Sequence, residues 1–318
     1  MTGGAHGQPW CRGCGGVDLV TGEQVAYGLV WERLEQDFSA SFGDDVRSRH
    51  TPASSMVVYT CRTCDVQSFH PAVAGGVDFY ERLSRSPAYY EQRRWEFGIV
   101  AGRLSPGGVV VDVGSGPGVF LAMARQRGCR AVAVETNPSA TAELRRKGLA
   151  VHATARDVLE AVGQVDVVTA FQVVEHVEDV TAFLQETVEL VAPGGSLNIS
   201  VPNRERVGRA AFEPLDHPPH HLTRWSADAL AILAARHDLT LQEVLFEGPD
   251  PSGARIGARL VVDSMAKSWP MPARRFLVRA AGRVASRQPT HGLLTRTRVF
   301  ARAGVHGHTI LASYRKLG

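Results

Sequence analysis

Residues 109–128 read VVVDVGSGPGVFLAMARQRG, and this order of residue types predicts how the fold begins. A run of β-branched residues predicts a buried strand, which leads directly into a glycine-rich turn. Pro117 and Gly128 are typical of the first turn and the end of a helix. Because ligands of open α/β sheets bind at the carboxyl ends of strands, the turn is a candidate ligand site.

The same alternation of strands and helices continues along the chain. Further strands are predicted at 130–135, 149–153, 165–174, 196–201, 239–247 and 308–316. Helices are predicted within 78–103 and at 138–148, 179–195 and 226–237. Strands that alternate with helices in this way favour a doubly wound α/β sheet.

The glycine spacing separates this turn from the dinucleotide-binding fingerprint, which would need a glycine at the position of Val119. Glu135 ends the next strand and could accept hydrogen bonds from both hydroxyls of a ribose. Another type of nucleotide-binding α/β enzyme is the alternative interpretation. The residues of the turn follow the pattern D-x-G-x-G-x-G and are Asp112, Gly114, Gly116 and Gly118.

Two longer stretches resemble class I S-adenosylmethionine-dependent methyltransferases. They are VVDVGSGPGVFLAMARQRGCRAVAVETNP and QVDVVTAFQVVEHVEDVTAFLQETVELVAPGGSLNISVPN. The resemblance runs from about residue 78 to 247 and resumes at 308–316. It implies a seven-stranded Rossmann-like sheet with an antiparallel last strand, and S-adenosylmethionine as the cofactor.

The resemblance also implies a role for each residue around the cofactor. The three glycines of the turn would line the methionine and ribose portions, and Asp112 would approach the methionine amino group. Glu135 would hold the ribose hydroxyls, Thr136 would lie beside the adenine, and Gln172 would lie near the sulfonium. Candidates for a further adenine contact are Thr154, Ala155 and Asp157.

Four of the five cysteines form two C-x-x-C pairs, Cys11 with Cys14 and Cys61 with Cys64. In a reducing compartment such pairs favour one tetrahedral structural Zn²⁺ site over disulfides, with unrelated thiol pairs as the alternative. Residues 1–75 have few apolar periods, so we expect them to bury little without a metal. YTCRTCDVQSFHP resembles the second knuckle of zinc-ribbon segments fused to bacterial small-molecule and sugar methyltransferases. Cys129 is predicted to be a buried thiol.

The stretch DHPPHHLTRW, residues 216–225, holds three of the twelve histidines. Its two prolines predict a stiff, extended loop, which in this fold would cross the substrate entrance. We expect His220 or His221 to lie near His176, which follows Glu175 after the fourth strand. One reading makes a histidine the general base, with a pKa near neutrality.

Two other readings of these histidines stay open. They could join Glu175 and His176 around a metal ion, or they could be purely structural. Related ubiquinone-pathway and small-RNA methyltransferases carry E-x-x-E-H after the fourth strand, which can bind a divalent cation. This chain has Gln172 in place of the first carboxylate, which removes one charge from such a site and favours the base.

The predicted organisation is a zinc-ribbon-like segment at 1–77, a methyltransferase core at 78–251, a basic helical insertion or lid at 252–304, and the last strand within 305–318. The insertion holds eleven Lys or Arg and a single acidic residue, Asp263. It could be an amphipathic lid, a peripheral contact with an anionic membrane, or a contact with an anionic substrate. Nucleic acid is not favoured, because few aromatics interleave with the arginines.

The expected function is methyl transfer from S-adenosylmethionine to an oxygen or carbon of a small-molecule acceptor, such as a secondary metabolite, a sugar or a lipid-linked intermediate. The alternatives are an RNA methyltransferase and a catalytically silent module that binds the cofactor and a partner. The sequence shows neither a signal peptide nor an apolar run of about 20 residues, so a cytoplasmic protein is expected, with peripheral membrane contact as the variant.

Overall fold

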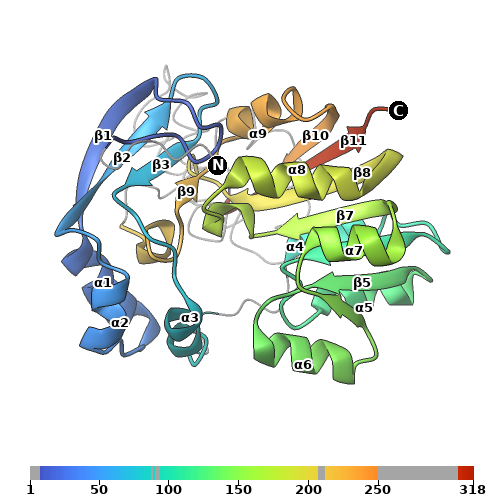
Figure 1. Ribbon diagram of the computed structural model, residues 1–318, viewed down its shortest axis with the longest axis horizontal. Helices are drawn as coiled ribbons and strands as arrows, with labels where there is room; N and C mark the ends of the chain where they lie inside the picture. The colour runs from blue at the N-terminus through green and yellow to red at the C-terminus, as the bar shows by residue number, and fades with distance from the viewer. Residues whose placement is uncertain (1–7, 87–88, 90–93, 207–211, 249–306) are drawn as a thin grey trace, which may run out of the picture.

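The computed structural model describes residues 8–86, 89, 94–206, 212–248 and 307–318. These residues form a seven-stranded sheet and a four-stranded sheet that lie side by side (Figure 1). The predicted basic insertion, 252–304, falls outside the described residues. Within the described part, no helix is long and apolar enough to cross a membrane.

The larger sheet has the strand order β10-β11-β8-β7-β4-β5-β6. Strands β4 to β8 run parallel to their neighbours, whereas β11 is antiparallel to both β8 and β10. The predicted seven-stranded Rossmann-like sheet with an antiparallel last strand is therefore confirmed. The strands are β4 (Val109–Val113), β5 (Arg130–Val134), β6 (Ala150–His152), β7 (Val165–Phe171), β8 (Val191–Pro202), β10 (Leu239–Phe246) and β11 (Thr309–Lys316).

Helices cover both faces of this sheet, because successive strand side chains point to opposite faces. Val111 packs in the core with α7, α8 and α9, while its neighbour Val110 packs in the core with α4, α5 and α6. Cys129 is buried in the second of these cores, as predicted. The helices are α4 (Trp95–Ala101), α5 (Val119–Gln126), α6 (Pro138–Arg146), α7 (Ala155–Val162), α8 (Val180–Leu190) and α9 (Ala227–Ala234).

Helix α7 was not predicted from the sequence. Thr154 and Asp157 form a reciprocal capping box at its N-terminus, in which each side chain accepts a hydrogen bond from the backbone of the other. Two of the three candidate adenine contacts are thus engaged in starting a helix. Asn137 caps α6 in a similar way, ahead of Pro138 at the first helical position.

The smaller sheet consists of β1 (Leu19–Ala26), β2 (Ser55–Cys61), β3 (Gln67–His70) and β9 (Thr223–Arg224). The prediction that the N-terminal segment buries little is wrong. Trp31, Phe42 and Phe79 pack with ring centroids 5.2 to 6.0 Å apart, inside a core built with α1 (Tyr27–Phe38), α2 (Asp44–Arg49) and α3 (Val77–Leu83). These aromatic residues are far apart in the chain, so no periodic pattern in the sequence indicates that they form a core.

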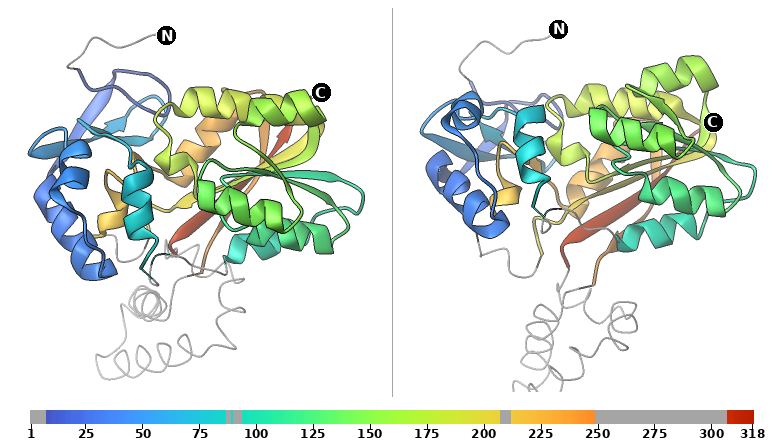
Figure 2. Two further views of the ribbon diagram at one scale, coloured as in Figure 1. Left: turned by 60° about the horizontal axis from the view of Figure 1, so that its bottom comes forward. Right: turned by 90° about the horizontal axis from the view of Figure 1, so that it is seen from below.

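The two sheets are joined through the histidine-rich stretch. Strand β9 lies within that stretch, after its histidines, and pairs antiparallel with β3, with Thr223 opposite Ser68 and Arg224 opposite Gln67. Helix α3 lies between the helices α1 and α2 and the larger sheet (Figure 2). The histidines are therefore placed where the two halves of the molecule meet.

Candidate active site

The glycine-rich turn follows β4, and all three of its glycines have positive φ, at 72°, 51° and 77° for Gly114, Gly116 and Gly118. A Cβ at Gly114 would lie 2.5 Å from Val173, so the turn packs directly against the chain that follows β7. Gly116 has no neighbour within 4 Å of such a Cβ. The turn is thus closed on the Val173 side and open at Gly116, as a close approach of a ligand requires.

Glu135 links the turn to the end of β5. Its Oε2 accepts a hydrogen bond from the Gly116 amide at 2.8 Å, and its Oε1 accepts from the amides of Thr136 and Asn137 at 2.8 and 2.7 Å. The carboxylate therefore holds the turn in place as well as facing the predicted ribose position. The Thr136 side chain is exposed at the same edge of the sheet.

Asp112 is the buried carboxyl group at the end of β4. Thr169 Oγ1 donates a 2.7 Å hydrogen bond to its Oδ1. Burial is the main cause that raises the pKa of Asp112 to about 7, and the nearby Glu135 adds to the effect. A cationic group bound beside Asp112 would reverse this shift by favouring the charged form.

Gln172 ends β7 with a positive φ of 56°, and its amide group donates to Ser200 Oγ at 3.3 Å. Val173 contacts the glycine turn, and Glu175 and His176 follow in a short 3₁₀ turn, Val174–His176. The carboxyl ends of β4, β5 and β7 thus bring the predicted cofactor residues to one edge of the sheet.

The histidine-rich stretch is a turn, not the predicted extended loop. The amides of His220 and His221 both donate to the carbonyl of His217, at 3.0 and 3.1 Å, and so close a turn over Pro218 and Pro219. Leu222 then donates its amide to the Glu175 carbonyl at 2.8 Å, which fixes the stretch to the end of β7.

His176, His220 and His221 form a compact cluster. Their ring centroids lie 4.3 to 4.8 Å apart, and His220 and His221 are both 5% exposed. One nitrogen from each ring lies within 4.8 Å of the others, a spacing that would also allow a metal ion to bind. The predicted proximity of His220 and His221 to His176 is confirmed. Hereafter we call these three residues the histidine cluster.

Backbone carbonyls fix the tautomers of two members of the cluster. His176 Nδ1 donates to the His220 carbonyl at 2.6 Å, and His220 Nδ1 donates to the Leu215 carbonyl at 2.9 Å. Each ring therefore keeps its lone pair on Nε2. A lone pair on Nε2 is what either a proton acceptor or a metal ligand requires.

The expected near-neutral pKa of the histidines is wrong. Burial lowers the pKa of His176 to about 4 and lowers the pKa values of His220 and His221 well below the usual 6.5. Burial also raises the pKa of Glu175 to about 8. None of the described residues donates a hydrogen bond to either carboxyl oxygen of Glu175. The three histidines of the cluster and Glu175 are therefore mostly uncharged at pH 7.

Two tyrosines that the sequence did not indicate contact the histidine cluster. The Tyr80 hydroxyl lies 3.0 Å from His176 Nδ1, and the Tyr89 hydroxyl lies 3.1 Å from His220 Nε2. His217 does not join the cluster. Its Nδ1 bonds to the Glu213 carbonyl, and its Nε2 accepts from Arg224 at 2.6 Å. In the following stretch, TRWS, Trp225 is fully buried and Ser226 caps α9.

The four cysteines of the C-x-x-C pairs converge where β1 begins and β2 ends, with Cys11 and Cys14 ahead of β1, Cys61 at the end of β2 and Cys64 after it. Cys11 Sγ lies 3.4 Å from Cys64 Sγ, Cys14 Sγ lies 3.6 Å from Cys61 Sγ, and none is in a disulfide. The two knuckles match each other, because the Gly15 amide donates to the Cys11 carbonyl as the Asp65 amide donates to the Cys61 carbonyl. The cluster fits a zinc-ribbon-like segment.

Comparison with known proteins adds the family. Residues 88–244 match the family described as methyltransferase domain. An uncharacterized methyltransferase of Mycobacterium sp. (strain JLS) is 36% identical over 121 residues, which are 37% of this chain and 47% of that protein. A ubiquinone biosynthesis O-methyltransferase of Xanthomonas axonopodis pv. citri (strain 306) is 32% identical over 114 residues, 33% of this chain and 48% of that protein.

Among solved structures, a SAM-dependent methyltransferase from Archaeoglobus fulgidus aligns with a TM-score of 0.46 and 14% identity, over 69% of this chain and 94% of that one. The chain spans about half the length of the curated relatives it matches. The matched residues contain the glycine turn, Glu135 and the whole histidine cluster. The family match, the glycine turn and the seven-stranded sheet support a class I S-adenosylmethionine-dependent methyltransferase.

Proposed function

We propose that the chain transfers the methyl group of S-adenosylmethionine to an oxygen or carbon atom of a small-molecule acceptor, and that a member of the histidine cluster takes up the acceptor's proton. The observation that carries this proposal is the position of the cluster. His176 lies in the short turn that follows β7, and the same turn region packs through Val173 on the glycine turn. The relatives named as ubiquinone biosynthesis O-methyltransferases support a small acceptor.

The residues at the edge of the sheet fit the cofactor. Asp112 is a buried carboxyl group with no cationic partner in hydrogen-bond contact in the described chain, which suits the methionine ammonium. Glu135 and Thr136 would hold the ribose and flank the adenine, and Gln172 would lie near the sulfonium. When bound, the cofactor supplies the methyl group and its leaving group. The protein must then orient the acceptor and receive its proton.

His176 is the favoured proton acceptor. Its Nδ1–H is held by a carbonyl, so Nε2 carries the lone pair, and burial keeps the ring neutral. A positioned base of this kind contributes about 10²–10⁴ in rate. Its low pKa weakens it as a base, so the acceptor must be held close to its Nε2. His220 and His221 would orient it and the acceptor.

The experiment that tests this function is the transfer of a labelled methyl group. The protein is incubated with methyl-labelled S-adenosylmethionine and a panel of phenols, sugars and lipid-linked intermediates, with RNA as a separate arm. Labelled small-molecule product together with S-adenosylhomocysteine is the expected result. Label on RNA alone would contradict the small-molecule assignment, and binding without turnover on any arm would favour the silent module.

Cofactor affinity should depend on pH through Asp112. The ammonium of S-adenosylhomocysteine needs the ionised carboxylate, and this group has a pKa of about 7 in the free protein. Affinity should therefore rise as pH rises from 5.5 toward 8, by up to about tenfold per unit below the pKa. Calorimetric titrations across this range measure it.

Asp112→Asn should bind weakly at every pH and lose most of this dependence. Asp228→Asn, an exposed change in the first turn of α9, should keep the wild-type profile. An affinity for S-adenosylhomocysteine that is equal at pH 5.5 and pH 8 in the wild type would remove Asp112 from the ammonium site.

We also propose that Cys11, Cys14, Cys61 and Cys64 hold a structural Zn²⁺. Four thiolates about 2.3 Å from a tetrahedral ion lie roughly 3.8 Å from one another, close to the 3.4 and 3.6 Å found here. A Cβ at Gly16 would lie 3.2 Å from Cys14 Sγ, so the knuckle also needs a glycine there. Because β3 begins three residues after Cys64 and pairs with β9, the ion would brace the strand that follows the histidines.

A further inference from the structure

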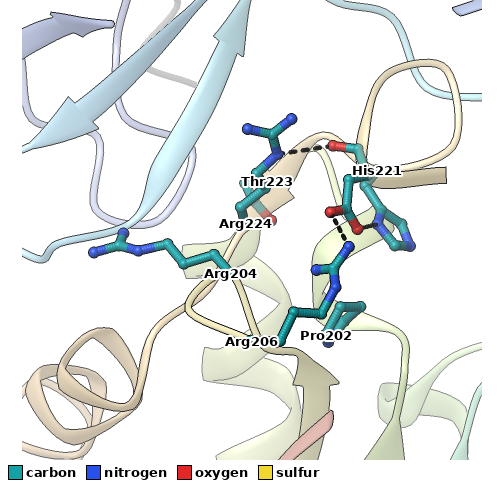
Figure 3. Close-up of a pocket in the computed structure, with 7 residues that line it drawn as sticks. Pro202, Arg204, Arg206, His221, Thr223 and Arg224 are labelled. Atoms are coloured by element: carbon teal, nitrogen blue, oxygen red, sulfur yellow. Dashed lines mark hydrogen bonds and ion pairs between the residues drawn. The ribbon is translucent and has the colours of Figure 1, made fainter. Parts of the chain in front are cut away.

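A small open cleft lies at the carboxyl end of β8, beside the histidine cluster (Figure 3). Its empty volume, counted out to solvent, is about 180 Å³. His221 belongs both to this cleft and to the cluster, so a molecule seated in the cleft lies beside the ring that neighbours His176, the proposed base. The lining side chains are those of Pro202, Arg204, Arg206, Asp216, His221, Thr223 and Arg224.

Positive charge is in excess around this cleft. Arg206 and Asp216 form a 2.6 Å ion pair, and their side chains are only 11% and 13% exposed. Arg224 is also mostly buried, at 16%, yet its two closest partners are uncharged. They are the Asp216 carbonyl at 3.0 Å and neutral His217 Nε2 at 2.6 Å. Two buried guanidinium groups thus share one buried carboxylate.

The remaining acidic partners do not cancel this excess. Glu23 lies 3.3 Å from Arg224, but its side chain is 63% exposed, and ion pairs to such groups are strongly screened. Asp65 pairs with Arg204 at 2.6 Å. Figure 3 shows that the Arg204 side chain points away from Arg206, so this pair stands apart from the other two arginines.

A buried cation without a buried counter-ion is costly, and a bound anion relieves that cost. Guanidinium groups match the planar or tetrahedral oxygens of carboxylates and phosphates, and each has five N–H donors. Arg206 uses only Nη1 and Nη2 for its two hydrogen bonds within the described chain. Donors therefore remain for a ligand next to the unbalanced charge.

We propose that this cleft binds an oxyanion, a phosphate or carboxylate group, between Arg206 and Arg224. This inference rests on the proposed function: the oxyanion is part of the acceptor. The acceptor would then approach the base from the side on which His221 lies. The cleft is open to solvent and encloses space for only about one water-sized group, so only the charged end of a ligand would enter it. The acceptor is thus an anionic small molecule anchored by its charged end.

Binding is tested first with inorganic phosphate and, in a parallel arm, with acetate, each against chloride at matched ionic strength. The thermal unfolding midpoint and calorimetry report binding, because a ligand of the folded state stabilises it. The wild type should show a saturable rise with phosphate or acetate that chloride does not give. A response to phosphate alone identifies a phosphate group, and a response to acetate identifies a carboxylate.

Arg224→Gln is the decisive variant, because it leaves the Arg206–Asp216 pair intact. It should weaken oxyanion binding about tenfold or more while S-adenosylhomocysteine still binds. Arg224→Lys, which keeps the charge, should recover part of the affinity. It also shows whether the protein still folds when residue 224 is substituted. Arg146→Gln, an exposed change on α6, should behave as wild type.

Two results would overturn the proposal: a wild type that responds to phosphate and acetate no more than to chloride, or full oxyanion binding in Arg224→Gln. Both are independent of methyl transfer. A protein that binds phosphate but not S-adenosylhomocysteine would defeat the proposed function and leave the oxyanion site standing.

Discussion

His176→Ala is expected to lower kcat by about 10²–10⁴ with little change in S-adenosylhomocysteine affinity. The variant removes the one imidazole of the cluster that follows β7 directly and has its tautomer fixed by a carbonyl. The measurement is the labelled methyl transfer with an accepted substrate at saturating cofactor. His237→Ala, beyond the end of α9 and outside the cluster, is the matched control and should keep the wild-type kcat.

The pH profile tests whether a histidine base has the lowered pKa that burial gives it. A general base must be unprotonated, and His176 has a pKa of about 4. Turnover at saturating cofactor should therefore persist as pH falls from 8 to about 5, below the range in which an ordinary histidine would protonate. Unchanged kcat after substitution of His176, His220 and His221, singly and together, would show that positioning alone suffices.

The spacing of the histidine cluster also makes a metal role testable in the same assay. A chelator that leaves the four-cysteine zinc in place should not affect turnover if His176 acts as a base. Loss of activity with such a chelator, restored by Mg²⁺ or Mn²⁺, would assign the cluster to a metal.

Cys61→Ser is expected to remove the zinc and lower the thermal unfolding midpoint. Structural zinc binding contributes about 10–16 kcal/mol in small domains, which is comparable to the whole stability of a typical domain. The aromatic core around Trp31 should keep part of the N-terminal segment folded. Because β3 pairs with β9, we also expect kcat to fall.

Metal analysis and thermal unfolding check this prediction. The wild type should contain about one zinc per chain. Cys129→Ser changes a buried thiol in a different core and should leave the zinc content unchanged. Two disulfides and no zinc in the purified protein would contradict the four-cysteine site.

The parts of the fold that the sequence predicts are those encoded by neighbouring residues. Val109–Val113 and the glycines after it show a buried strand and a tight turn directly, and the positive φ of Gly114, Gly116 and Gly118 bears this out. Helix α7 was missed because it is only eight residues long and because its start depends on a reciprocal Thr154–Asp157 cap. The N-terminal core was missed because its rings come from distant elements.

The sequence predicts which residues belong to the site, but not what surrounds them in the folded protein. Gln172, Glu175 and His176 are visible as a motif, and His220 and His221 as a histidine-rich stretch. The contact of Tyr80 with His176 joins residues far apart in the chain, and no local pattern encodes it. The low pKa of His176 follows from burial at the junction of the two sheets, which exists only in the folded protein.

The most direct test of the central claim, that the glycine turn and Glu135 bind the cofactor, is a calorimetric titration of S-adenosylhomocysteine into wild type and Glu135→Ala. The account predicts saturable binding to the wild type. It predicts a loss of roughly 1–3 kcal/mol in the variant, because the ribose hydroxyls and the Gly116 amide lose their acceptor. No binding to the wild type, or equal affinity in both proteins, would contradict it.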